Sequence, residues 1–141
     1  MIPVIFINSR SVPFVDMIME GKKLYETRTR NVLKSAFEYG NRFLIAETGN
    51  GKPVVRCSAT IEAMHTIYTE EAWDRYRKFH AVPAGSEFDW KPDTKKKVLY
   101  HLTDVQPVEP FVPEGKRHGR TWMECSNCPD KNFTETYYKM Y

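Results

Sequence analysis

The strongest turn signal in the chain is the run Gly-Asn-Gly-Lys-Pro at residues 49–53, and β-prone segments flank it on both sides. Residues 42–48 form the segment before the turn, and residues 54–66 form the segment after it. Two such segments joined by a short glycine-containing turn predict an antiparallel hairpin. Because no long helices separate these strands, they favour a closed or curled β-structure over a parallel sheet.

The start of the chain predicts a strand, a short helix and a second strand. Residues 2–8 are nearly all apolar and β-prone, which indicates a buried strand. Ser11 is suited to cap a short helix, and Gly21 is placed to end it. The polar strand that follows begins a few residues after this glycine.

The second half of the chain predicts one more helix and one more strand. Thr69 is expected to cap a helix that ends at residues 83–85, and residues 98–102 are expected to form a strand. Three prolines follow, at Pro107, Pro110 and Pro113. Because proline cannot donate a ladder hydrogen bond, either strand character there is confined to a sheet edge or the prolines lie outside the ladder. Together these patterns predict an α+β fold.

Composition limits the classes of protein to be considered. A chain of 141 residues fits one domain, and 41% hydrophobic residues indicate a globular protein. No apolar run approaches the roughly 18 residues of a membrane span, and the start lacks the pattern of a signal peptide. We therefore expect a cytoplasmic protein. The net charge of +3 permits a nucleic-acid partner if the basic residues cluster.

The polar strand after the first helix is the most informative segment for function. In an extended strand, Glu26, Arg28 and Arg30 point to one face, and Lys23 lies in the turn just before them. Opposite charges at positions i and i+2 on one face can contact and hold each other. The segment is therefore either a solvated salt-bridge face or a preorganised polar site.

This segment, with the elements around it, resembles the ASCH domain, a small β-barrel of the PUA-like superfamily. The matching positions are Gly21, Lys23, Glu26 and Arg28, spaced as Gly-x-Lys-x-x-Glu-x-Arg. The resemblance implies one domain over residues 1–141, a small, mostly antiparallel barrel with flanking short helices. The barrel core covers about residues 2–112, and a basic loop and an aromatic tail follow at residues 113–141.

The resemblance also implies a cleft at one mouth of the barrel, lined by Lys23, Glu26 and Arg28 and suited to RNA or a nucleotide. An arginine fork fixed by a glutamate can engage a phosphate or a base edge in a directed way. The alternative is that Glu26 and Arg28 only brace the barrel mouth. Lys23 is the strongest candidate for ligand contact, since its turn position has little structural need of a lysine.

Some ASCH proteins are enzymes, and the resemblance therefore implies a hydrolase as the alternative function. One branch hydrolyses the amide of N4-acetylcytidine, and ribonuclease activity is associated with others. That branch has threonine where this chain has Glu26, and its acidic site residue does not align clearly with Glu62, Glu70 or Glu71. Lys23 is the one candidate catalytic residue, although the neighbouring Glu26 is expected to raise its pKa rather than lower it.

A second basic constellation lies near the end of the chain, between residues 115 and 122. Its cations, histidine and tryptophan stand beside glycines, as expected for a mobile loop that follows phosphates and stacks a base. The alternative is a solvated surface loop. If the barrel forms, this loop can fold over the cleft. The full set of predicted ligand-binding residues is Lys23, Glu26, Arg28, Arg30, Lys116, Arg117, His118, Arg120 and Trp122.

Cys125 and Cys128 form a single C-x-x-C pair. A structural zinc site needs four ligands, and the chain has no second C-x-x-C pair; Cys57, His101 and His118 could complete a site only by a coincidence of folding. Two free or redox-paired thiols are therefore the favoured interpretation, and we expect no metal ion or cofactor. The sequence predicts RNA or a nucleotide as the partner and leaves the oligomeric state open.

Overall fold

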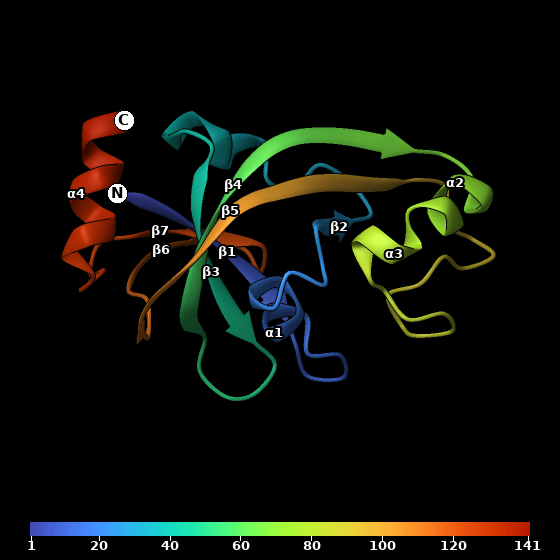
Figure 1. Cartoon of the computed structure of the whole chain (residues 1–141), viewed down its shortest axis with the longest axis horizontal. Coiled ribbons are helices and arrows are strands. Elements are labelled where there is room, and N and C mark those ends of the chain that lie inside the picture. The colour runs from blue at the N-terminus through green and yellow to red at the C-terminus, as the bar shows by residue number, and fades with distance from the viewer.

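The computed structural model describes the chain from Met1 to Tyr141 and consists of one seven-stranded sheet with short helices (Figure 1). The strands are β1 (Ile2–Asn8), β2 (Tyr25–Arg28), β3 (Arg42–Thr48), β4 (Val54–Ile67), β5 (Lys97–Phe111), β6 (Gly115–His118) and β7 (Trp122–Cys125). The helices are α1 (Phe14–Met19), the 3₁₀ helix η1 (Lys34–Tyr39), α2 (Glu70–Arg75), α3 (Arg77–His80) and α4 (Lys131–Met140). None of the helices is long and apolar enough to cross a membrane.

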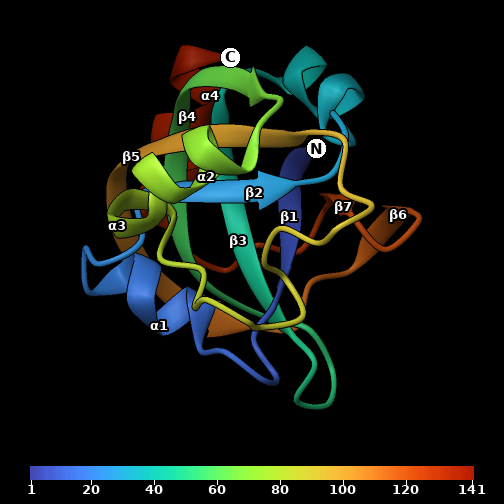
Figure 2. The same ribbon diagram turned by 90° about the vertical axis from the view of Figure 1, so that its right-hand side faces the viewer.

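The sheet is mixed, with the strand order β2-β5-β4-β3-β1-β7-β6. Strands β1 and β3 run parallel, and all other neighbours are antiparallel. The predicted α+β class and the predominance of antiparallel pairing are confirmed. The sheet curves strongly, as the long strands β4 and β5 show (Figure 2). Its two edge strands, β2 and β6, do not pair with each other, so the predicted closed barrel is not confirmed.

The predicted hairpin around residues 49–53 is confirmed, since β3 and β4 pair antiparallel on either side of it. Gly49 and Gly51 have φ angles of +95° and +99°, which L side chains rarely adopt. A side chain at Gly49 would also meet Asn8 at 2.7 Å. Both glycines are therefore required by the turn, which joins the end of β3 to the beginning of β4 and lies against the end of β1.

Strand β5 is longer than the predicted residues 98–102, because it continues through Pro107 and Pro110. Strand β2 pairs with β5 only at its beginning, up to the hydrogen bond between Leu102 N and Leu24 O. Beyond that point β5 has no neighbour on this side, so the prolines lie along an open edge. The first of the two alternatives, strand character at a sheet edge, is confirmed.

The helices differ from the predictions in two places. Thr69 caps α2 as predicted, with its Oγ1 accepting a hydrogen bond from Ala72 N at 3.1 Å, but the helix breaks at Tyr76 into α2 and α3. Helix α1 begins at Phe14 without a side-chain cap. The predicted cap, Ser11, instead donates a hydrogen bond to Glu87.

Two apolar clusters lie on opposite faces of the sheet, because neighbouring residues of β1 and β3 point to alternate sides. The larger cluster holds Ile5, Phe43 and Trp73, and α1 and α2 contribute to it. The smaller one holds Phe6 and Tyr137, and α4 covers it. The predicted aromatic tail is therefore a packed helix, and Figure 1 shows it at the opposite end of the molecule from α2 and α3.

Candidate nucleic-acid interface

The polar segment predicted from the sequence lies at the edge of the sheet. Helix α1 ends at Met19 with Glu20 as its C-cap, and the next residue, Gly21, has a φ angle of +76°. The backbone N–H groups of Lys22 and Lys23 then both donate to Met17 O, which turns the chain back toward the sheet. Strand β2 follows and pairs with β5, and Glu26 lies opposite Tyr100 in this pairing. The edge position leaves one side of β2 open.

Glu26 and Arg28 form the ion pair that their spacing predicts. Arg28 Nη2 lies 2.9 Å from Glu26 Oε2, and Thr27 N donates to the other carboxylate oxygen at 2.9 Å. The same Nη2 donates to the carbonyl oxygen of Phe6 at 2.5 Å. Arg28 therefore links the edge strand β2 to β1, which belongs to the other part of the curved sheet.

Part of the Arg28 guanidinium remains without a protein partner. Its Nη1 makes no hydrogen bond within the protein, and its Nε is buried without one. The side chain is 19% exposed and lines a pocket of about 270 Å³. The remaining residues of this pocket are Ile7, Asn8, Phe14, Glu26, Thr27, Thr29, Glu87, Phe88 and Lys97. Arg28 therefore presents a fixed, charged donor to an open pocket.

Lys23 has a different environment from the one predicted. Its side chain is buried, 1% exposed, and its Nζ donates to the carbonyl oxygen of His80 at 2.6 Å and lies 4.4 Å from the centre of the Phe14 ring. Burial lowers the pKa of Lys23 to about 8 and outweighs the opposing charge of Glu26. The expectations of a raised pKa and of little structural need for a lysine are wrong. Lys23 does not line the pocket beside Arg28.

His80, which supplies the carbonyl group that Lys23 contacts, was not a predicted site residue. Its ring stacks on Trp73 with 3.7 Å between centroids, and its Nε2 lies 3.0 Å from Trp73 O. Its Nδ1 accepts a hydrogen bond from Val82 N at 2.9 Å, and burial lowers its pKa to about 4. His80 is thus a neutral core residue, and no sequence motif marks it.

The predicted basic loop is a hairpin formed by β6 and β7, with Gly119 at φ +64° in its turn. Trp122 is 2% exposed and belongs to the larger apolar cluster. The His118 ring stacks on it at 4.0 Å between centroids, and His118 Nε2 lies 2.7 Å from Glu124 Oε2. The predicted base-stacking role of Trp122 is therefore wrong, because its ring is enclosed in the core.

The hairpin nevertheless places one of its cations, Arg117, against Phe6, which Arg28 also contacts. Phe6 is the meeting point: its carbonyl oxygen accepts from Arg28, its N–H donates to Thr121 O, and its ring lies 4.7 Å from the Arg117 guanidinium. Arg117 and Arg120 line a further pocket together with Thr48. Thr48 pairs with Asn8, which lines the Arg28 pocket, so each pocket is lined by one residue of the same strand pairing.

On its other side, the Arg28 pocket continues into a lysine-lined surface. Thr29, Glu87 and Lys97 line both the Arg28 pocket and this neighbouring surface. The lysines of that surface were not predicted as site residues, although the run at residues 95–97 is visible in the sequence. We call these three pockets the basic groove. Its accessible cationic residues are Arg28, Lys91, Lys95, Lys96, Arg117 and Arg120, whereas Lys97 is buried with its Nζ donating to Phe88 O; its acidic residues are Glu26, Glu87, Asp89 and Asp93.

The other predicted site residues lie outside the groove. Arg30 is exposed in the bend after β2, and Lys116 is exposed on the edge strand β6; neither lines the three pockets. Cys125 and Cys128 are free thiols, and Cys125 Sγ donates to Asn127 Oδ1. No three metal-binding side chains are grouped in the structure.

The fold and the Gly-x-Lys-x-x-Glu-x-Arg segment together define an ASCH-like α+β domain, and comparison with solved structures agrees. A structure of ASCH from Zymomonas mobilis is 21% identical, with a TM-score of 0.64 over 97% of this chain and 94% of that chain. A single-residue mutant of the same protein is 22% identical, with a TM-score of 0.68 over 98% of this chain and 94% of that chain. A second single-residue mutant is 23% identical, with a TM-score of 0.66 over 97% of each chain. No family model and no curated protein matches the chain. The predicted resemblance to the ASCH domain is confirmed at the level of the fold.

Proposed function

We propose that the protein binds RNA or a nucleotide in the basic groove, with Arg28 as the central contact. The observation that carries this proposal is the state of the Arg28 side chain. Glu26 and the Phe6 carbonyl hold it through Nη2, while Nη1 has no protein partner and the side chain lines a pocket. A guanidinium fixed in this way is suited to directed contact with a phosphate or a base edge.

The position of the groove supports the same proposal. The pocket lies where the edge strand β2 approaches β1, and it is lined by Glu26 and Arg28, two of the three residues that the ASCH resemblance assigns to the cleft. Lys95 and Lys96 lie on one side of it, and Arg117 and Arg120 line the pocket beside Thr48. Cations spaced along a groove can follow successive phosphates of a strand, and this favours a strand over a single nucleotide.

The alternative, a hydrolase acting on RNA or a modified nucleoside, is less well supported. Its one candidate catalytic residue is Lys23, and the burial of Lys23 Nζ against His80 keeps that amine away from the groove. A general base or nucleophile must come within reach of the reacting atom. RNA recovered intact after incubation with the protein would agree with binding alone, and cleaved RNA would favour the alternative.

The proposal is tested by titrating a short single-stranded RNA into the wild-type protein and two variants at low and moderate salt. We expect affinity to fall linearly on logarithmic axes as salt rises, and Arg28→Met to bind about 10- to 100-fold more weakly. Arg75→Met is the matched control, because Arg75 is exposed on α2 and pairs only with Glu71. Absence of binding at low salt, or equal binding by Arg28→Met and the wild type, would overturn the proposal.

A further inference from the structure

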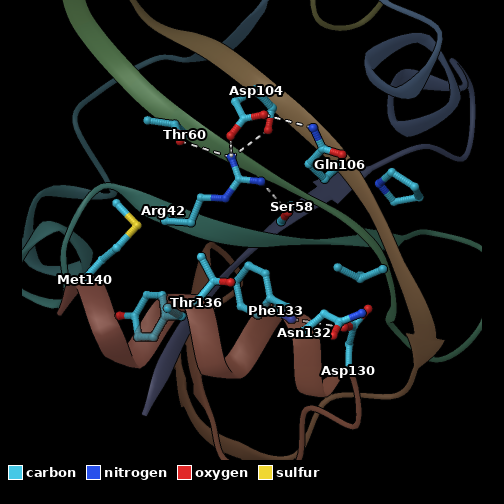
Figure 3. Close-up of a pocket in the computed structure, with 13 residues that line it drawn as sticks. Arg42, Ser58, Thr60, Asp104, Gln106, Asp130, Asn132, Phe133, Thr136 and Met140 are labelled. Carbon is cyan, nitrogen blue, oxygen red and sulfur yellow. Dashed lines mark hydrogen bonds and ion pairs between the residues drawn. The ribbon is translucent and has the colours of Figure 1, made fainter.

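A second pocket, of about 320 Å³, lies between the sheet and α4 (Figure 3). None of its residues lines the basic groove. One wall consists of side chains from β3, β4 and β5, and the other consists of side chains from α4 and the residue before it. Figure 3 shows the two walls facing each other across the space.

The sheet wall is organised around Arg42, whose side chain is 12% exposed. Its Nη1 donates to Thr60 Oγ1 at 3.0 Å and to Asp104 O at 2.6 Å, and its Nη2 donates to Ser58 Oγ at 2.7 Å. Asp104 also pairs with Arg42 through its carboxylate, at 3.4 Å, and accepts a hydrogen bond from Gln106 Nε2 at 2.9 Å. These contacts fix the guanidinium in one orientation, and Arg42 Nε makes no hydrogen bond within the protein.

The helix wall is largely aromatic. Phe133 and Tyr137 lie on successive turns of α4, with 6.0 Å between ring centroids and an interplanar angle of 20°. Asn132 and Thr136 add an amide and a hydroxyl group to the same wall. Asp130 is also present, but both of its carboxylate oxygens accept hydrogen bonds from backbone N–H groups.

The polar groups of this pocket carry little unbalanced charge. Arg42 is matched by Asp104, and backbone donors occupy the carboxylate of Asp130. The groups left for a ligand are the Gln106 carbonyl, the Asn132 amide, the Thr136 hydroxyl and the unused N–H groups of Arg42. This set offers donors and acceptors together, beside a wall of aromatic rings.

We propose that this pocket binds an uncharged planar heterocycle with hydrogen-bond donors and acceptors on its edge, such as a nucleobase or nicotinamide. The ring of such a molecule would contact the aromatic wall, and its edge would meet the polar groups around Arg42. The volume is at the low end of the roughly 300–1,000 Å³ of small-molecule sites, which fits a single ring system. This inference is independent of RNA binding in the basic groove.

The test is a titration of isotope-labelled protein with adenine, cytosine and nicotinamide, followed by NMR. Benzyl alcohol serves as a ring without the polar edge, and inorganic phosphate serves as an anion. We expect saturable binding of at least one heterocycle, with resonance shifts confined to α4 and the adjoining parts of β3, β4 and β5. Neither benzyl alcohol nor phosphate is expected to bind the same residues with comparable affinity.

Two variants locate the site. Thr136→Phe places a large ring in the cavity and is expected to weaken binding at least about tenfold, and Arg42→Lys is expected to weaken it about tenfold by removing the fork. The matched control is Glu135→Phe, which places the same ring at an exposed neighbour on α4 and leaves binding unchanged. Thermal unfolding of all three variants checks that they are folded. If Thr136→Phe does not fold, the binding measured for Arg42→Lys tests the location of the site.

The inference is overturned if none of the three heterocycles binds saturably in the millimolar range. It is equally overturned if binding is unchanged in Thr136→Phe or Arg42→Lys, because the ligand would then occupy another place. Comparable binding of benzyl alcohol would show an unspecific apolar groove, and comparable binding of phosphate would show an anion site. Each of these results contradicts a pocket selective for an uncharged heterocycle.

Discussion

Lys23 and Arg28 belong to the same short segment and carry the same charge, yet their surroundings differ. Lys23 is enclosed, and its Nζ contacts His80 O and the Phe14 ring. Arg28 Nη2 donates to both Glu26 and the Phe6 carbonyl, and Arg28 Nη1 has no partner within the protein. The difference shows that a motif position does not determine what a cation contacts. What a cation contacts is determined by the neighbouring residues that accept its hydrogen bonds.

The physical reason for the difference is the position of α3. Lys23 lies beneath the end of this helix, where Ala81 adopts a left-handed conformation with φ 58° and the His80 carbonyl points toward the amine. A cation at the carboxyl end of a helix is favourably placed. Arg28 lies farther along β2, beyond the reach of this helix, and meets β1 instead.

The largest effect is expected for Lys23→Ala, which would show whether this residue is structural. Removing the side chain leaves a cavity beside Phe14 and an unpaired carbonyl at His80, so the free energy of unfolding should fall by about 2–4 kcal/mol. Chemical denaturation measures this change. Lys22→Ala is the control, because Lys22 is exposed and should change stability by less than about 0.5 kcal/mol. A stable Lys23→Ala protein that had lost RNA binding would reverse the roles assigned to Lys23 and Arg28.

The second effect is the contribution of Lys23 to the pH dependence of the free energy of unfolding. Its pKa is about 8 in the folded protein, below the ordinary value of 10.5, so between these values the unfolded chain binds more protons. The stability of the wild type should therefore rise with pH across this window, relative to Lys23→Met. Subtracting the two denaturation series removes the contributions of other groups, such as Cys57 and Tyr100. A difference that stays constant or falls with pH would show that Lys23 does not carry a buried charge.

A smaller effect is expected for Glu26→Gln, which tests how Arg28 is held. Loss of the charged partner frees the guanidinium, and RNA affinity should fall about tenfold. In the double variant with Arg28→Met, the loss should be no larger than for Arg28→Met alone, because the glutamate acts through the arginine. Additive losses in the binding titrations would assign Glu26 a separate contact with the ligand.

The smallest effect is expected at the far side of the groove, for Arg120→Ala. Loss of one phosphate contact should weaken RNA binding a few-fold and reduce the slope of log affinity against log salt by about 1. The same change at Arg10, which is exposed and lines none of the groove pockets, provides the control. An unchanged slope in Arg120→Ala would restrict the binding surface to the Arg28 pocket and the lysines beside it.

Local sequence patterns predicted much of the fold and, within the candidate site, the pairing of Glu26 with Arg28. The glycine-rich turn at residues 49–53 predicted the hairpin, and strand alternation predicted that Glu26 and Arg28 would pair. The ASCH spacing predicted the fold that the solved structures share. Each of these features depends on neighbouring residues, and the sequence displays such neighbours directly.

The remaining features depend on residues that are distant in the sequence. Lys23 is buried because His80 folds over it, and Trp122 is enclosed because its hairpin packs against the rest of the sheet. The pocket around Arg42 exists only where the sheet and α4 meet. No local pattern shows these contacts, so a lysine in a turn and a tryptophan in a basic loop were expected to be available to a ligand.

The assignment of different roles to Lys23 and Arg28 is tested most directly by side-chain NMR during RNA titration. The guanidinium resonances of Arg28 and the Nζ resonance of Lys23 are assigned by comparison with Arg28→Met and Lys23→Met. As single-stranded RNA is added at low salt, we expect the Arg28 resonances to shift with saturation while the Lys23 resonance stays in place. A shift at Lys23 with none at Arg28 would contradict the account.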